Sequence, residues 1–182
     1  MRPAYPTALH RQYLWGDPLP VASGTCNPGR MNRDELVNLA RDIATRAHAG
    51  QVDKAGVPYI RHPIAVAARL LARYPDAPAT AEAAALLHDV LEDTDVTADD
   101  LLTAGIPQEA VDIVVAVTKV PGESTEDYFA RVRALLWSRR LKEADIDENT
   151  DPDRLELLDP DTRTRMEGKY RRSRALLADQ DA

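Results

Sequence analysis

Four residues near the middle of the chain have the types and the spacing of a metal or acid–base site. His88 and Asp89 are adjacent, and Glu92 and Asp93 follow them four positions later. Residues four apart lie on one face of a helix, about 6 Å apart along its axis. Two potential metal ligands are therefore followed, one turn later, by two carboxylates. This arrangement suits a site for a divalent cation.

The sequence around these residues is apolar on one side and unusually acidic on the other. Alanine and leucine precede the motif in AALLHDVLEDT, so part of this helix is predicted to be buried. Burying charged groups is costly unless a cation or hydrogen bonds compensate. From His88 to Asp100 the chain has six acidic residues and no Lys or Arg, which a divalent metal explains. The alternative is a solvated acidic face with one ordinary histidine, and the His-Asp pair alone favours that alternative.

Two helices are predicted to carry the histidines. The motif lies on a predicted helix over about residues 81–93, and Pro63, a favourable first-turn residue, starts another that extends to about Arg73. His62, in the string PYIRHP, then lies at a helix N-terminus. Such a position is a rigid mount for a ligand.

The rest of the chain from Asn32 onward is also predicted to be helical. Asn32 and Glu35 have the pattern of a capping box, and apolar residues follow at helical spacing. Further helices are predicted after Thr97 with Gly105 as the stop, from Pro107 to near Lys119, from Ser124 to about Trp137, from about Arg139 to Glu148, and from Asp151-Pro152 and Asp159-Pro160. No strand pair or repeat is evident, so the expected fold class is all-α.

Composition and charge exclude several classes of protein. The 182 residues include 23 Lys and Arg against 30 Asp and Glu, a net charge of −7, which argues against a general nucleic-acid-binding surface. The single cysteine, Cys26, excludes an intramolecular disulfide framework and a Cys-rich zinc site. No run of about 18 apolar residues is present, and the first residues lack a continuous apolar stretch. We therefore expect no membrane span, no secretory signal and a cytoplasmic location.

Together with Asp145, the histidines and the motif resemble a known family. His62, the His88-Asp89 pair and Asp145 resemble the H…HD…D pattern of the HD superfamily of metal-dependent phosphohydrolases. The strings ATRAHAGQVDKAGVPYIRHPIAVA, ALLHDVLEDTDVT, AVTK and LKEAD…N, in this order, are similar to the hydrolase domain of RelA/SpoT homologues, which include stand-alone small alarmone hydrolases such as the metazoan SpoT homologue. The similarity covers about Arg41 to Asp151, and the remaining length has no room for a nucleotide synthetase domain.

The resemblance implies a fold, a metal site and a reaction. It implies a compact HD-domain helical bundle over residues 31–182 with a central metal site, preceded by a Pro/Gly-punctuated extension over residues 1–30. The implied metal ligands are His62, His88, Asp89 and Asp145. Mn²⁺ is the expected ion, and Fe²⁺ or Zn²⁺ also fits nitrogen and oxygen ligands. Glu92 and Asp93 match the family's catalytic pair, which orients or deprotonates the attacking water. The family reaction removes pyrophosphate from the 3′ position of guanosine tetra- or pentaphosphate.

The resemblance also assigns residues to the nucleotide, with one departure. The implied substrate-binding residues are Lys54, Tyr59, Lys142, Asn149 and the position of Asp53. Family members with guanine specificity usually have Arg at the position of Asp53, facing the base. An acid there leaves the choice between guanosine and adenosine alarmones, (p)ppGpp and (p)ppApp, open. On this basis we expect Asp53→Arg to shift preference toward guanosine.

Three functions therefore stay open at the level of sequence. The first is a metal-dependent alarmone 3′-pyrophosphohydrolase, and the second is an HD phosphohydrolase acting on another nucleotide or phosphoester. The third is a nucleotide-sensing HD protein without turnover, which has no chemical need for Glu92 and Asp93. The expected partner is a small nucleotide, with no nucleic acid and no membrane. Whether the protein forms a homo-oligomer is left open.

Overall fold

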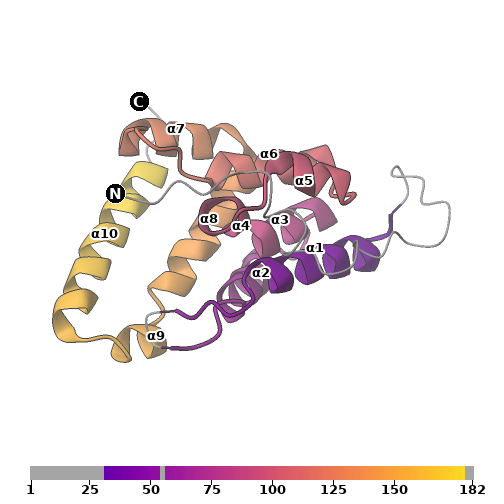
Figure 1. Cartoon of the computed structure of the whole chain (residues 1–182). Coiled ribbons are helices and arrows are strands. Elements are labelled where there is room, and N and C mark those ends of the chain that lie inside the picture. Colours follow the sequence, from indigo (N-terminus) through magenta and orange to yellow (C-terminus); the bar gives the residue numbers. More distant parts are fainter. Residues whose placement is uncertain (1–30, 54–55, 179–182) are drawn as a thin grey trace. The chain divides into compact units, whose positions relative to one another are not determined.

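The computed structural model describes residues 31–53 and 56–178 and confirms the all-α prediction for them (Figure 1). The expected extension over residues 1–30 and the predicted substrate-binding Lys54 lie outside the described residues. The helices are α1 (Arg33–Ala47), α2 (Arg61–Arg73), α3 (Ala79–Leu87), α4 (Val90–Asp93), α5 (Ala98–Thr103), α6 (Gln108–Val117), α7 (Thr125–Ala134), α8 (Leu136–Asn149), α9 (Pro152–Glu156) and α10 (Pro160–Ala178). Outside them, the described residues have one isolated antiparallel bridge, between Val52 and Pro58.

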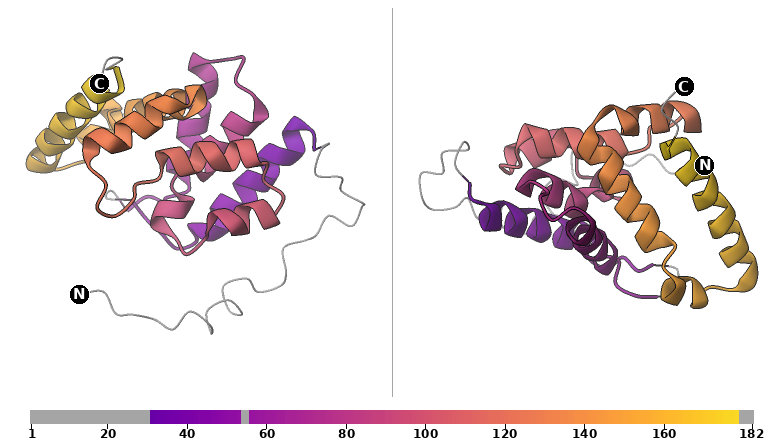
Figure 2. Two further views of the ribbon diagram at one scale, coloured as in Figure 1. Left: turned by 90° about the horizontal axis from the view of Figure 1, so that it is seen from above. Right: turned by 180° about the vertical axis from the view of Figure 1, so that it is seen from behind.

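Helix α3 lies at the centre of the packing. It contacts α1, α2, α6 and α8, and its side chains are nearly all alanine or leucine with at most 1% of their surface exposed over residues 83–87. A helix that is apolar on every side is stable only when it is surrounded by other elements. The second centre of packing is α8, which contacts α2, α6, α7 and α10 (Figure 2). The site described below forms where these two centres meet α2.

The helix start and stop signals are confirmed. Asn32 and Glu35 form a reciprocal capping box at α1, and Thr97 forms another with Asp100 at α5. Ser124 accepts a hydrogen bond at the start of α7. Gly105 ends the α5 segment with a φ of 99°, a left-handed conformation that glycine adopts without strain. These residues predicted the helix ends correctly because each one satisfies, or allows the chain to satisfy, backbone groups at a helix end.

The helix predicted over residues 81–93 is wrong in one respect, because it is interrupted at the motif. Regular helix ends at Leu87 and resumes at Val90 as α4. The His88 imidazole Nδ1 lies 2.8 Å from the Ala85 carbonyl oxygen, the acceptor that the Asp89 amide would use in a continuous helix. His88 and Asp89 thus occupy a turn, where their side chains leave the regular helix face.

The boundary between the two helices predicted around Trp137 also differs. Helix α7 ends at Ala134, and α8 begins at Leu136 after an extended Leu135 with φ −113° and ψ 132°. The buried Ser138 hydroxyl donates to the Val132 carbonyl oxygen at 2.6 Å, which satisfies an acceptor that the break leaves without its helical partner. The tenth helix, α10, packs on α7 and α8 through a cluster that includes Tyr170 and Leu177. Among the described residues, no helix is long and apolar enough to cross a membrane.

Candidate active site

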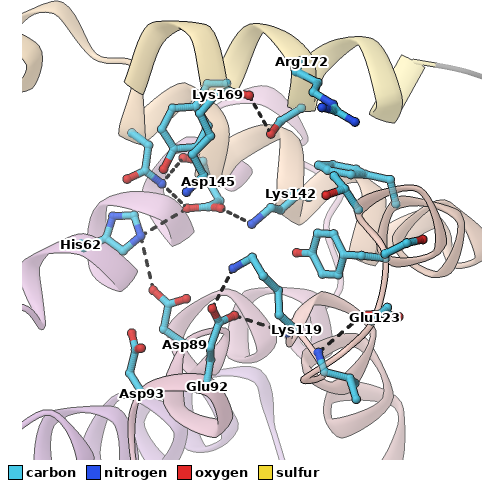
Figure 3. A pocket seen from close by; sticks show the side chains of 18 of the residues that line it. His62, Asp89, Glu92, Asp93, Lys119, Glu123, Lys142, Asp145, Lys169 and Arg172 are labelled. Carbon is cyan, nitrogen blue, oxygen red and sulfur yellow. Dashed lines mark hydrogen bonds and ion pairs between the residues drawn. The ribbon is translucent and has the colours of Figure 1, made fainter. Parts of the chain in front are cut away.

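Three side chains from separate helical segments converge in the interior. His62 lies in the first turn of α2, His88 follows α3, and Asp145 lies on α8. One ligand atom from each of the three lies within 4.8 Å of the other two, and each residue is 5% exposed or less. Asp89 lies beside them, with its Oδ2 3.0 Å from His88 Nε2. The same oxygen is 3.5 Å from His62 Nε2 (Figure 3).

The state of His88 shows that this cluster fits a metal ion. Its Nδ1 is 2.8 Å from the Ala85 carbonyl oxygen and donates to it. Its buried Nε2 faces the cluster, where Asp89 Oδ2 lies 3.0 Å away but outside hydrogen-bond geometry. A metal-ligating histidine typically donates its other N–H in this way. Burial alone lowers the pKa of His88, but the Asp89 and Asp145 carboxylates outweigh burial and raise it to about 9. The same negative potential attracts a cation, so the donor set fits a divalent metal.

Tyr59, predicted to bind substrate, contacts a predicted metal ligand. Its hydroxyl donates to Asp89 Oδ2 at 2.6 Å. Burial and the Asp89 carboxylate raise the pKa of Tyr59 far above its ordinary value, so the hydroxyl stays a donor. Tyr59 therefore orients the Asp89 carboxylate, and its ring also borders both cavities described below.

Lys142 and Asn149, also predicted to bind substrate, both hold Asp145. Lys142 Nζ donates to Asp145 Oδ2 at 2.7 Å, and Asn149 Nδ2 donates to Asp145 Oδ1 at 2.5 Å. Burial raises the pKa of Asp145, but Lys142 and the imidazoles of His62 and His88 outweigh burial and hold it well below its ordinary value. These contacts keep Asp145 ionised and oriented toward the cluster, and both residues also line the main cavity.

A cavity of about 420 Å³ opens from the cluster and is bordered by the Glu92-Asp93 pair. Lys119 contacts both oxygens of Glu92, with its Nζ 2.7 Å from Oε1 and its backbone amide 3.3 Å from Oε2 (Figure 3). Burial, followed by the Asp89 and Glu92 carboxylates, raises the pKa of Asp93. A carboxylate with a raised pKa is a better proton acceptor near neutral pH.

Asp53 lies at a second cavity of about 270 Å³ and is already paired. Its Oδ1 accepts from the Val57 backbone amide at 3.0 Å, which closes the turn before PYIRHP. Its Oδ2 lies 3.3 Å from Nη2 of Arg154, on α9. The two cavities share Tyr59, His62, Asn149, Lys169 and Tyr170 as lining residues.

Sequence reasoning missed several residues that line these cavities, and four of them bear on the argument below. They are Arg154 on α9 and Lys169, Tyr170 and Arg172 on α10. The strongly charged sequence of α10 gave little sign of a functional face. One signal was available, because Met166, Tyr170 and Leu177 recur at helical spacing and all pack against the same core cluster. That pattern places α10 on the body of the protein, and the cations beside Tyr170 then lie at the cavity.

Residues 40–149 match the family model for the HD domain, and the chain belongs to that family. Two curated relatives are named guanosine-3′,5′-bis(diphosphate) 3′-pyrophosphohydrolase. The one from Vibrio cholerae is 46% identical over 86 residues, 47% of this chain and 12% of the relative. The one from Borreliella burgdorferi is 41% identical over 81 residues, 44% of this chain and 12% of the relative. The matched segment is thus a small part of these relatives.

A solved structure has the same fold. It is titled "A metazoan ortholog of SpoT hydrolyzes ppGpp and plays a role in starvation responses" and is 21% identical to this chain. The alignment covers 84% of this chain and 91% of that one, with a TM-score of 0.67. The predicted all-α HD fold is therefore confirmed, and so is the similarity to hydrolases of the RelA/SpoT type.

Proposed function

We propose that the chain is a metal-dependent 3′-pyrophosphohydrolase of guanosine or adenosine alarmones, (p)ppGpp or (p)ppApp, with residues 31–182 as the hydrolase domain. The observation that carries the proposal is the buried His62, His88 and Asp145 cluster at the end of a cavity bordered by Glu92 and Asp93. A site that only held a metal for stability would have no need for two further carboxylates facing open space. The names of the curated relatives support this substrate class.

His62, His88, Asp89 and Asp145 are the residues that would hold the metal, and Mn²⁺ is the ion we propose. The site offers two nitrogen donors and two oxygen donors and no thiolate, a donor set that suits Mn²⁺. A bound divalent cation supplies Lewis-acid stabilisation of phosphate oxygens and lowers the pKa of water. The four side chains reach the cluster from helical segments that pack directly on one another, so their geometry is fixed before substrate arrives.

The carboxylate pair carries out the proton transfer of the hydrolysis. Asp93, with its raised pKa, and Glu92 take the proton from the attacking water. The water oxygen bonds to the phosphorus attached to O3′ of the ribose, the P–O3′ bond breaks, and O3′ takes up a proton. The products are pyrophosphate and a nucleoside 5′-phosphate, which is GDP when the substrate is ppGpp.

Cationic side chains that line the cavity bind the phosphates. Lys119, Lys169 and Arg172 all line the cavity. Lys119 is paired with Glu92, so a phosphate that binds Lys119 releases a Glu92 oxygen for the water. This exchange couples arrival of the substrate to activation of the carboxylate pair.

The test is turnover of a nucleotide panel by the purified protein. We would incubate it with Mn²⁺ and ppGpp, ppApp, NADPH or ordinary nucleoside triphosphates, and follow pyrophosphate and orthophosphate. The proposal predicts pyrophosphate from ppGpp or ppApp and little product from the others. Turnover of a different nucleotide would show an HD phosphohydrolase of another specificity. Tight binding of ppGpp without any turnover would show a nucleotide sensor, and either result would refute the proposal.

A further inference from the structure

The second cavity combines apolar side chains with two cations, Arg154 and Lys169. Leu158, Met166 and Tyr170 line it together with Asp53 and Arg154. It meets the main cavity at His62, which borders both. A ligand whose phosphate lies at the metal cluster can therefore extend a flat apolar group into the second cavity. Lys119 and Arg172 line the larger cavity and not the second one, so the larger cavity takes the other phosphates and the second cavity is left for a nucleobase.

Arg154 is held in place by acidic neighbours, but its guanidinium still has N–H groups that can donate to a ligand. Its Nη2 is 3.3 Å from Asp53 Oδ2, and its Nη1 is 3.3 Å from Glu148 Oε1 and 3.4 Å from His62 Nδ1. These contacts are longer than the 2.6 Å between Arg69 Nε and Glu148, and longer than about 2.8 Å, the usual charge-assisted distance. The guanidinium has five N–H donors, and 26% of the side chain is exposed.

We propose that Arg154 reads the nucleobase and makes the site prefer guanine to adenine, with Asp53 and Glu148 as the residues that position it. A guanidinium donates only, and guanine offers two adjacent acceptors, O6 and N7, whereas adenine presents an N6 amino donor at the place of O6. The inference rests on the proposed function for its substrate class. It also resolves the choice that Asp53 left open, since the acid positions a cation supplied by α9.

This pairing changes the outcome expected for Asp53→Arg. The sequence alone predicts that the substitution shifts preference toward guanosine. In the structure it would place a second guanidinium beside Arg154 and remove the carboxylate that holds it. We now expect Asp53→Arg to lose guanine preference, and the double variant Asp53→Arg with Arg154→Asp to regain part of it.

The experiment compares guanine and adenine nucleotides on wild type and Arg154→Gln. We would measure kcat/KM for ppGpp and ppApp, and the Kd of GDP and ADP with Mn²⁺ present. Wild type should prefer guanine by about tenfold or more, and Arg154→Gln should bring the ratio close to one, mainly by raising KM for ppGpp. Asp53→Asn, which keeps the side-chain size, should fall in between.

Arg46→Gln is the control, because Arg46 is exposed in the last turn of α1 and lines neither of the two described cavities. It should leave the base preference intact, and thermal melts of all variants check the fold.

An unchanged ratio in Arg154→Gln, or a wild type that favours adenine, would overturn the inference while ppGpp turnover leaves the proposed function standing. If nothing is turned over, the GDP-to-ADP affinity ratio still decides the role of Arg154. Wild type that binds neither GDP nor ADP would refute it.

Discussion

The metal cluster and the second cavity are adjacent but are built differently. The cluster residues are 5% exposed or less, and Asp145 is held by bonds of 2.5 and 2.7 Å from Asn149 and Lys142. At the second cavity, Arg154 lies on a five-residue helix, is 26% exposed and has contacts of 3.3 to 3.4 Å. The metal cluster is thus rigid and buried. The second cavity, by contrast, can be altered by substitutions that leave the core unchanged.

The largest effect on metal binding and turnover is expected at the metal cluster, from Asp145→Asn. The neutral amide removes one metal ligand and leaves the Lys142 ammonium without its carboxylate, so bound metal and turnover should both fall to background. Metal content and pyrophosphate release measure the two losses. Because loss of the ion pair also lowers stability, His62→Gln serves as the second variant and should show the same joint loss. Full activity in a folded His62→Gln protein would contradict the metal assignment.

The next largest effect is expected from Glu92→Gln, which should separate metal binding from turnover. Glu92 is not in the converging cluster, so the variant should keep its metal, while kcat falls by about 10²–10⁴-fold because a proton acceptor is lost. Single-turnover rates with bound-metal analysis give both quantities. Glu109→Gln, an exposed first-turn residue of α6, is the control. A Glu92→Gln enzyme with the wild-type rate would refute the proposed role of Glu92.

Tyr59→Phe should have an intermediate effect, because it removes the hydroxyl that orients Asp89 but no ligand. Loss of such a supporting bond typically lowers metal affinity by about 10–100-fold. Titration of the metal-free protein with Mn²⁺ measures this change, and excess Mn²⁺ should restore most activity. Tyr74→Phe loses a similar hydroxyl-to-carboxylate bond, to Glu143, away from both described cavities and should titrate like wild type. A change in KM alone would instead support the sequence-based assignment of Tyr59 to substrate.

The smallest effect is expected from Arg172→Gln on α10. Its ion pair with Glu126 is 66% and 60% exposed on the two sides, and exposed pairs contribute little to stability. The Tm should therefore stay unchanged, while KM for a tetraphosphate substrate rises a few-fold because Arg172 lines the main cavity. Calorimetry and steady-state kinetics test the two parts separately. A lower Tm with unchanged KM would assign Arg172 to packing.

The fold was largely predictable because its signals are local. Capping residues such as Asn32 and Thr97 and stops such as Gly105 satisfy the backbone within one turn. The break after Leu87 was not predictable, because it depends on the His88 side chain taking the Ala85 carbonyl oxygen. A pattern of residue types shows that a helix is favoured, but not which acceptor a polar side chain will occupy.

The site was predictable in its residues and less so in their contacts. His88 and Asp89 are neighbours in sequence, so the motif itself was visible. The contact of Tyr59 with Asp89 joins residues 30 positions apart and depends on how the segments pack. Lys142 and Asp145, by contrast, lie three positions apart on α8, so their ion pair is local. The Asp53–Arg154 pair joins residues 101 positions apart. Such long-range pairs leave no periodic signal in the sequence, so these contacts could not be predicted from it.

The most direct test of the metal-dependent mechanism is a titration of the metal-free protein with Mn²⁺, following bound metal and pyrophosphate release from ppGpp in the same samples. The proposed site predicts that both rise together and saturate at one Mn²⁺ per chain, and that neither rises in His62→Gln. Turnover that persists without metal, or that is unrelated to the occupancy of a single site, would contradict the account.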